Sequence, residues 1–133
     1  MEGNYSVRIE HFAEGHFIKS FRKKYHAAWE VTWRAIDAQL ARIDALLETE
    51  KADHIVGDDA IKIIKTQFKI AGTQESTKSS GNRCIVAWHT DERYVVVLLV
   101  YGKTDLSGKH ETAEWQGIVK KNYPQYRRLF NGC

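Results

Sequence analysis

The chain has 133 residues, of which 43% are hydrophobic and 11% are aromatic. This length supports one domain with its own hydrophobic core, and this composition excludes a disordered chain. The N-terminal residues lack a basic region followed by an apolar stretch, and the longest apolar run, residues 94–101, is too short to span a bilayer. Cys84 lies in an expected strand and Cys133 is the last residue, which argues against a disulfide framework. We therefore expect one cytoplasmic domain over residues 1–133, with no membrane span.

Positive charge is concentrated in three segments, although the net charge of the whole chain is only +3. Residues 17–26 hold four bases and no acid, residues 62–83 hold five bases and one acid, and residues 119–130 hold four bases and no acid. Each segment therefore carries a net charge of +4, whereas residues 30–53 hold six acids and three bases. If the three basic segments converge on one face, they form a footprint for phosphate groups. The alternative is a solvated basic surface without a partner.

The first part of the chain predicts a strand followed by two helices. Apolar and polar residues alternate over residues 5–9, as in a half-buried strand, and residues 17–25 have apolar side chains at helical spacing with basic side chains between them. An apolar repeat of period 3.5 predicts one long helix over residues 27–50, with no Gly or Pro to interrupt it. The repeat consists of Trp29, Trp33, Ile36, Leu40, Ile43 and Leu47.

The second part of the chain predicts a strand meander and a last helix. The expected elements are a turn at residues 56–59, one or two strands within 61–70, a polar and mobile loop or wide connection at 72–82, a central hairpin of residues 83–90 and 94–103, and a helix over about 109–121. Strands separated by a helical insert and then a meander predict an α+β fold: a small, mainly antiparallel sheet with helices on one side.

Several kinds of catalytic site are excluded by spacing. Residues 72–79 nearly match a phosphate-binding P-loop, but Thr77 stands where the second glycine is needed, and the loop leads into a strand and not into a helix. The six histidines include no HExxH pair, and no CxxC motif is present. We therefore expect neither an NTPase nor a metal enzyme, and no cofactor.

The remaining candidates are basic and phenolic side chains around the predicted hairpin. They are Lys65, Lys69, Lys78, Arg83, Tyr101 and Lys103. Cleavage of RNA without a metal needs a base for the 2′-OH, cations that stabilise the charge on the phosphorane, and an acid for the departing 5′ oxygen. Lys, Arg and Tyr side chains can supply all three functions.

Two stretches of the hairpin resemble the RelE/HigB-type toxins of bacterial toxin-antitoxin pairs. Residues 81–88 (GNRCIVAW) match a Gly-x-Arg-x-Ile strand, an acidic turn follows, and residues 96–107 (VVLLVYGKTDLS) match a hydrophobic strand that ends in Tyr-x-Lys before a Leu-Ser pair that opens the last helix. The early strand and helical hairpin also match the order of elements in that family, although the hairpin here is longer. The motif resemblance covers roughly residues 61–120, and the remainder agrees only in topology.

The resemblance implies a ribosome-dependent endoribonuclease that cleaves mRNA by metal-independent attack of the 2′-OH on the phosphate, and an acidic antitoxin protein that neutralises it. Arg83 matches the strand arginine that contacts the scissile phosphate, and Lys103 matches the basic residue after the central strand. The candidate catalytic residues are Arg83, Lys103, Tyr101 and Lys69, with Lys65 as the alternative for the strand lysine and with Tyr123 and Tyr126 as alternatives for the tyrosine. The candidate RNA-binding residues come from the basic segments and are Lys65, Lys78, Lys120, Lys121, Arg127 and Arg128. Two alternatives stay open: a ParE-like toxin that binds gyrase, and a non-catalytic protein-binding module of the same fold.

Overall fold

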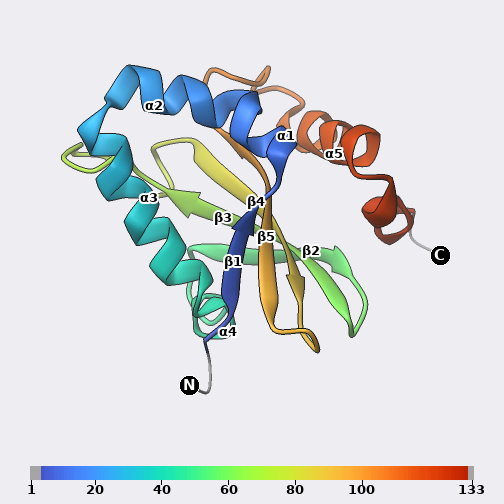
Figure 1. The fold of residues 1–133 in the computed structure, drawn as a ribbon. Coiled ribbons are helices and arrows are strands. Elements are labelled where there is room, and N and C mark those ends of the chain that lie inside the picture. The colour runs from blue at the N-terminus through green and yellow to red at the C-terminus, as the bar shows by residue number, and fades with distance from the viewer. Residues whose placement is uncertain (1–3, 132–133) are drawn as a thin grey trace.

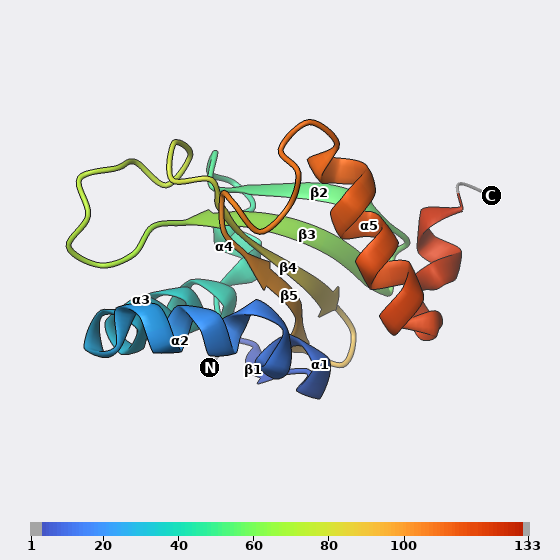
Figure 2. The same cartoon turned by 90° about the horizontal axis from the view of Figure 1, so that it is seen from above.

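The computed structural model describes residues 4–131 and has a five-stranded sheet with helices packed on both faces (Figure 1, Figure 2). The elements in chain order are β1 (Ser6–Ile9), α1 (His11–Ala13), the kinked segment η1 (Glu14–Ile18), α2 (Lys19–Tyr25), α3 (Ala27–Leu40), α4 (Ile43–Leu46), β2 (Ala52–Gly57), β3 (Ile61–Phe68), β4 (Asn82–His89), β5 (Tyr94–Tyr101), α5 (Glu111–Asn122) and the 3-10 helix η2 (Pro124–Phe130). Within residues 4–131, no helix is long and apolar enough to cross a membrane.

The strand order across the sheet is β1-β5-β4-β3-β2, with β1 parallel to β5 and the other pairs antiparallel. This confirms the predicted α+β class and the mainly antiparallel sheet. The central hairpin is also confirmed, because β4 and β5 pair from Arg83 opposite Tyr101 to His89 opposite Tyr94. Seven of the eight residues of β5 are buried, so the middle of the sheet needs a cover on each face.

Two hydrophobic cores lie on the two faces of the sheet, and the prediction that the helices lie on one side only is therefore wrong. On one face, Ile36 and Leu40 of α3 lie in a core with Val97 of β5. On the other face, Trp115 of α5 lies in a core with Leu98, and η2 extends this cover (Figure 2). The apolar residues on both faces of β5 are the physical reason, because each face has to be removed from water.

The predicted single helix over residues 27–50 is interrupted. Helix α3 ends at Leu40, and Arg42 leaves the helical conformation with φ −122° and ψ 46° before the short helix α4. The carbonyl of Ala41 accepts a hydrogen bond of 2.8 Å from the backbone N–H of Tyr5, just before β1. This tertiary hydrogen bond, which joins segments far apart in the sequence, offers the backbone an alternative to the helical one.

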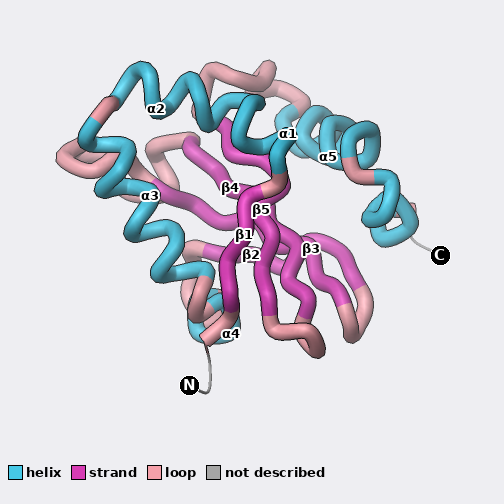
Figure 3. Tube along the Cα trace, viewed as in Figure 1, coloured by secondary structure: helices cyan, strands magenta, loops and turns pink. Residues whose placement is uncertain are grey.

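The sheet contains one strand that the sequence pattern did not indicate, β2 at the edge beside β3 (Figure 3). Only Ala52 of its six residues is buried, and the pairing with β3 shifts register between His54 and Val56. An exposed and irregular edge strand has no alternating apolar pattern, which is why the end of a helix and a turn were expected here.

The polar loop joins the antiparallel strands β3 and β4, which confirms the predicted wide hairpin connection. The loop is held by its own hydroxyl groups, and the alternative of a mobile loop is therefore not needed. Ser80 is 4% exposed, and its hydroxyl donates a hydrogen bond of 2.5 Å to the carbonyl of Phe68. The Ser76 hydroxyl donates to the hydroxyl of Ser79 at 2.9 Å. The loop therefore closes onto the end of β3 and brings the start of β4 into a defined position.

Candidate functional site

A cavity of about 490 Å³ lies at one end of the sheet, beneath the first turn of α5. We call it the α5 cavity. It is lined by Lys65, Arg83, Gly108, Lys109, His110, Glu111, Thr112 and Ala113. Lys65 comes from β3 and Arg83 from β4, and the other residues come from the loop after β5 and from the start of α5. Segments from three distant parts of the sequence therefore build one site.

Strand alternation places the two basic side chains on the same face. Ile63 and Ile85 lie in the core beneath α5, and Lys65 and Arg83 are each two residues away along β3 and β4. Because Lys65 pairs with Ile85 in the register of the sheet, Lys65 and Arg83 both lie toward the end at which the cover by α5 begins. They leave the core and line the cavity.

The Arg83 guanidinium has a structural function in addition to its position in the cavity. Its Nη1 donates to the carbonyl of Asn82 at 2.8 Å, and its Nη2 donates to the carbonyl of Lys78 at 3.0 Å. Arg83 thereby fixes the polar loop to β4. Among residues 4–131, its Nε–H has no hydrogen-bond acceptor, and this donor can serve an anion in the cavity.

Tyr101 is buried beneath the cavity, and its hydroxyl holds the carboxylate of Glu111, which lines the cavity. The Tyr101 hydroxyl donates a hydrogen bond of 2.5 Å to Oε2 of Glu111, in the first turn of α5. Burial, and then the Glu111 carboxylate, raise the pKa of Tyr101 far above its usual range, so the phenol stays protonated at neutral pH. With 1% of its surface exposed, Tyr101 can orient Glu111 but cannot itself reach a ligand in the cavity.

The N-terminus of α5 adds unsatisfied N–H groups to the cavity. The helix begins after His110, and no side chain caps this end. The backbone N–H groups of Glu111, Thr112 and Ala113 therefore have no acceptor within the helix, and these residues line the cavity. Together with the cations of Lys65, Arg83 and Lys109, these donors outnumber the single carboxylate of the lining, Glu111, and they can bind an anion.

Three of the other predicted residues lie elsewhere. Lys103 lines a different cavity, on the side of α2, and the exposed Lys69 comes just after β3 ends and lines a groove beside α3. Lys78 lies in the polar loop, near Lys51 and Asp53 of the β2 edge. The structure thus brings Lys65 and Arg83 together, with Tyr101 below them, but it does not bring Lys69, Lys78 or Lys103 into the same cavity.

The basic residues of the C-terminal segment have structural contacts away from the α5 cavity. Nε and Nη2 of Arg127 donate to the carbonyl of Lys120 at 3.1 Å, near the last turn of α5. Arg128 pairs with Asp58 at 2.8 Å and lowers the pKa of that carboxyl to about 2. Lys121 is exposed in the last turn of α5. Since α2 and α5 lie on opposite sides of the sheet (Figure 2), the three basic segments do not converge on one face.

The sequence patterns missed the three other titratable residues of the cavity, Lys109, His110 and Glu111. A signal for them was present, because the last helix was expected to begin near Lys109, and a helix N-terminus that follows a central strand is a place where charged groups gather. Cys84, by contrast, is buried in β4, and burial raises the pKa of its thiol to about 12, which excludes a thiolate nucleophile at neutral pH. Cys133 lies outside the described residues.

Comparison with known proteins identifies the fold. No protein-family model matches the sequence, and no curated protein matches it. Among solved structures, the crystal structure of the archaeal RelE-RelB complex from Pyrococcus horikoshii OT3 superposes with a TM-score of 0.54 and 11% sequence identity, over 77% of this chain and 99% of that chain. At this identity the likeness shows the fold alone: the chain has a RelE-like fold.

Proposed function

We propose that the chain is the toxin of a toxin-antitoxin pair, and that it cleaves mRNA with the scissile phosphate bound in the α5 cavity. One observation carries the proposal: cations from β3 and β4 share a single cavity with the uncapped N-terminus of α5. The RelE-like fold supports the class of protein. The resemblance of residues 81–88 and 96–107 to RelE/HigB-type toxins supports the substrate and the requirement for the ribosome.

The phosphate would be bound by groups of two kinds. Arg83 and Lys65 provide charge from the sheet, and the N–H groups of residues 111–113 point from the helix. The Arg83 guanidinium and the N–H groups of α5 are held by the fold before a ligand arrives. They stabilise most strongly the phosphorane, in which the phosphate carries an additional negative charge.

Glu111 and His110 are suited to the two proton transfers. In the proposed step, the Glu111 carboxylate takes the proton of the 2′-OH, the 2′ oxygen forms a bond to phosphorus, and the bond from phosphorus to the 5′ oxygen breaks. The His110 imidazolium gives its proton to the departing 5′ oxygen. The products are a 2′,3′-cyclic phosphate and a 5′-OH end, and Tyr101 orients Glu111 through its hydrogen bond of 2.5 Å.

An acidic antitoxin segment is the proposed partner. The RelE of the similar solved structure is in a complex with RelB, and the cavity of this chain carries exposed positive charge at Lys109. A carboxylate of the antitoxin in the α5 cavity would occupy the place of the RNA phosphate. Binding of that partner should weaken as the salt concentration rises, since exposed charges are screened.

The test is cleavage of a defined message by the purified protein with translating ribosomes, followed by mapping of the RNA ends. We expect 5′-OH and 2′,3′-cyclic phosphate ends, and no cleavage at a position with a 2′-deoxy nucleotide. Lys65→Ala and His110→Ala should each reduce the rate, whereas His54→Ala, at an exposed position of β2, should not. Absence of cleavage by the wild-type protein, with ribosomes and with bare RNA, would overturn the proposal and favour gyrase binding or a non-catalytic module.

A further inference from the structure

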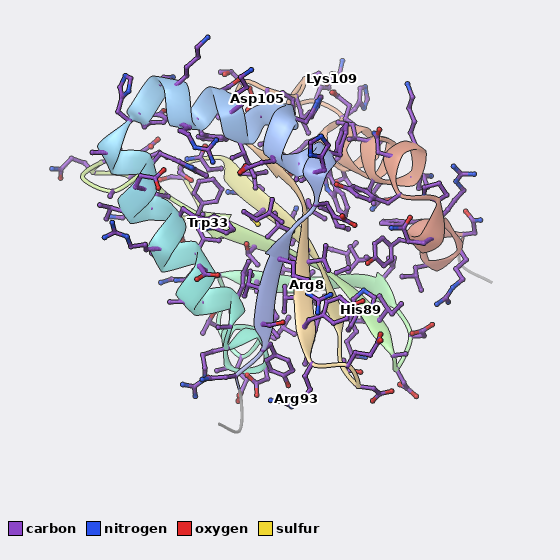
Figure 4. All side chains as sticks on the ribbon, viewed as in Figure 1. Arg8, Trp33, His89, Arg93, Asp105 and Lys109 are labelled. Atoms are coloured by element: carbon purple, nitrogen blue, oxygen red, sulfur yellow. The ribbon has the colours of Figure 1, made fainter. Side chains whose placement is uncertain are left out.

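A second cavity, of about 240 Å³, lies on the opposite side of β4 from the α5 cavity, between α2 and the loop after β5. We call it the α2 cavity. Phe21 and Tyr25 of α2, Asn82 at the start of β4, and Gly102, Lys103 and Asp105 of the loop line it. Figure 4 labels Asp105 beside α2, at the upper end of the molecule. Asn82 and Arg83 are neighbours in β4, so the two cavities lie on either side of the same strand end.

Asn82 is a buried polar side chain without a partner. It is 8% exposed, its backbone N–H donates to the Ser80 hydroxyl at 3.0 Å, and its backbone carbonyl accepts from Arg83. Its side-chain amide has no hydrogen-bond partner among residues 4–131. The amide atoms stay accessible from the cavity that Asn82 lines, so a ligand there can form hydrogen bonds with them without displacing a partner within the protein.

Three groups converge on the space above Gly102. A Cβ atom added there would lie 3.2 Å from Oδ1 of Asn82, 3.2 Å from Cζ of Phe21 and 3.3 Å from Oδ2 of Asp105. The Asp105 carboxylate is fixed, because its Oδ2 accepts a hydrogen bond of 2.6 Å from the backbone N–H of Gly102. An amide, a carboxylate and an aromatic edge therefore meet at Gly102 on one wall of the cavity, so closely that a side chain at position 102 would displace them.

The remaining walls suit a planar ring with a phosphate at the mouth. The rings of Phe21 and Tyr25 lie 6.1 Å apart at an angle of 25°, and they form an aromatic wall along α2. A cavity of about 150 Å³ holds a benzene ring, so this larger cavity has room for a nucleobase. Lys24 and Lys103 are exposed at its mouth and can pair with a phosphate.

We propose that the α2 cavity binds a guanine base. Guanine presents two adjacent donors, N1–H and the N2 amino group, which match a carboxylate such as Asp105, and acceptors at O6 and N7, which match the amide N–H groups of Asn82. Adenine, cytosine and uracil do not present two adjacent donors. The guanine belongs either to an RNA strand that runs over the strand end from the α5 cavity or to a free nucleotide, and the binding itself depends on no catalytic step.

The test is binding of mononucleotides to the full-length protein labelled with ¹⁵N, followed through the side-chain amide resonances of Asn82. We expect GMP to bind about tenfold or more tightly than AMP, CMP and UMP, and IMP, which lacks the 2-amino group, to bind more weakly than GMP. Asp105→Asn should lower the affinity for GMP about tenfold or more and raise that for xanthosine monophosphate, whose 2-oxo group accepts a hydrogen bond. Asp91→Asn, an exposed carboxylate in the turn between β4 and β5, is the matched control.

Two further variants, and a comparison of GMP with a trinucleotide, make the result decisive. Gly102→Ala should narrow the space, and Asn82→Ala removes a side chain that makes no internal hydrogen bond, so each should weaken GMP binding in a folded protein. Equal affinity for the four nucleotides, or GMP binding that none of the three cavity variants changes, would overturn the proposal.

A trinucleotide with a central guanine distinguishes the two sources of the base. If it binds much more tightly than GMP, the source is RNA, whereas equal affinities indicate a free nucleotide. RNA cleavage that persists without guanine binding would leave the proposed function in place and remove this inference alone.

Discussion

The two ends of the β4–β5 hairpin both carry polar and titratable side chains, but they use them differently. At one end, Nε2 of His89 lies 2.8 Å from the hydroxyl of Tyr126, and the His89 ring stacks on Tyr94 at 4.2 Å. At the other end, Arg83 and Lys65 line the open α5 cavity. Within residues 4–131, neither of these two side chains forms an ion pair with a carboxylate. At the first end, His89 and Tyr126 satisfy each other within the fold, whereas at the second end Lys65 and the Nε–H of Arg83 are left for a ligand.

The largest expected effect comes from the strand that joins the two ends. Leu98→Asp would place a carboxylate at a fully buried position of β5, which costs several kcal/mol, comparable to the whole stability of a domain of this size. We expect the variant to be unfolded or insoluble in thermal melting experiments. Val31→Asp, at a position that is 51% exposed, is the control and should melt like the wild type. Unchanged melting of Leu98→Asp would contradict the buried position of this strand.

The second prediction concerns Arg83, at the end of the hairpin that lines the α5 cavity. Arg83→Ala should reduce RNA cleavage about a hundredfold, equivalent to about 3 kcal/mol of transition-state stabilisation, and Arg83→Lys should restore only part of the rate because it lacks the planar fork. Since Arg83 also donates to the carbonyl of Lys78, loss of activity alone does not prove contact with the phosphate.

Two measurements separate these explanations. Limited proteolysis of Arg83→Ala should show faster cleavage within residues 72–81, because the loop loses its anchor. Lys65→Ala removes a charge from the same cavity without touching that loop, so it should lower the cleavage rate while the loop stays protected. A variant Lys65→Ala that retains full activity would show that the α5 cavity is not the site of the phosphate.

The sequence predicted the central part of the fold much better than its edges. The run of apolar residues in β5 and the hairpin around residues 83–101 follow from local composition, because a central strand is buried on both faces. The break after Leu40 and the edge strand β2 depend on tertiary contacts, such as the hydrogen bond from Tyr5 to Ala41, which leave no periodic pattern in the chain. The same pattern of apolar residues on both faces of β5 indicates helices on both sides of the sheet.

The candidate site was predictable only in part, for a related reason. Alternation along β3 and β4 places Lys65 and Arg83 on one face once the register is known, but sequence does not give that register. Lys69 and Lys103 lie just after their strands end, where alternation no longer determines direction. Glu111 enters the site through α5, and only the packing of that helix on β5 brings its carboxylate to Tyr101.

A third, smaller effect is expected from the hydrogen bond beneath the cavity. Tyr101→Phe removes the donor to Glu111 and should cost about 1.5–3 kcal/mol of stability, as for hydrogen bonds to charged groups. If Glu111 is the base, cleavage should also become slower, because its carboxylate loses the hydrogen bond that orients it. Tyr126→Phe, at the opposite end of the hairpin, should change stability but leave the cleavage rate as it is. An unchanged cleavage rate in Tyr101→Phe would remove Glu111 from the proton transfer.

The smallest expected effect concerns the opposite end of the hairpin, where His89 contacts Tyr126, and it tests whether that end has only a structural function. Burial lowers the pKa of His89 in the folded protein below its usual 6.5, although Glu92 acts in the opposite direction. The unfolded chain therefore binds a proton more readily than the folded one. The stability that neutral His89 contributes is present above pH 6.5 and is lost as the pH falls below it.

We expect urea denaturation of the wild type to show a lower free energy of unfolding at pH 5.5 than at pH 7.5, and a smaller difference between the two pH values in His89→Gln. His54→Gln, at an exposed position, should keep the difference of the wild type, and cleavage of RNA at pH 7.5 should be nearly the same in all three proteins. A large loss of cleavage in folded His89→Gln would mean that the packed end also takes part in the function, and the contrast between the two ends would no longer hold.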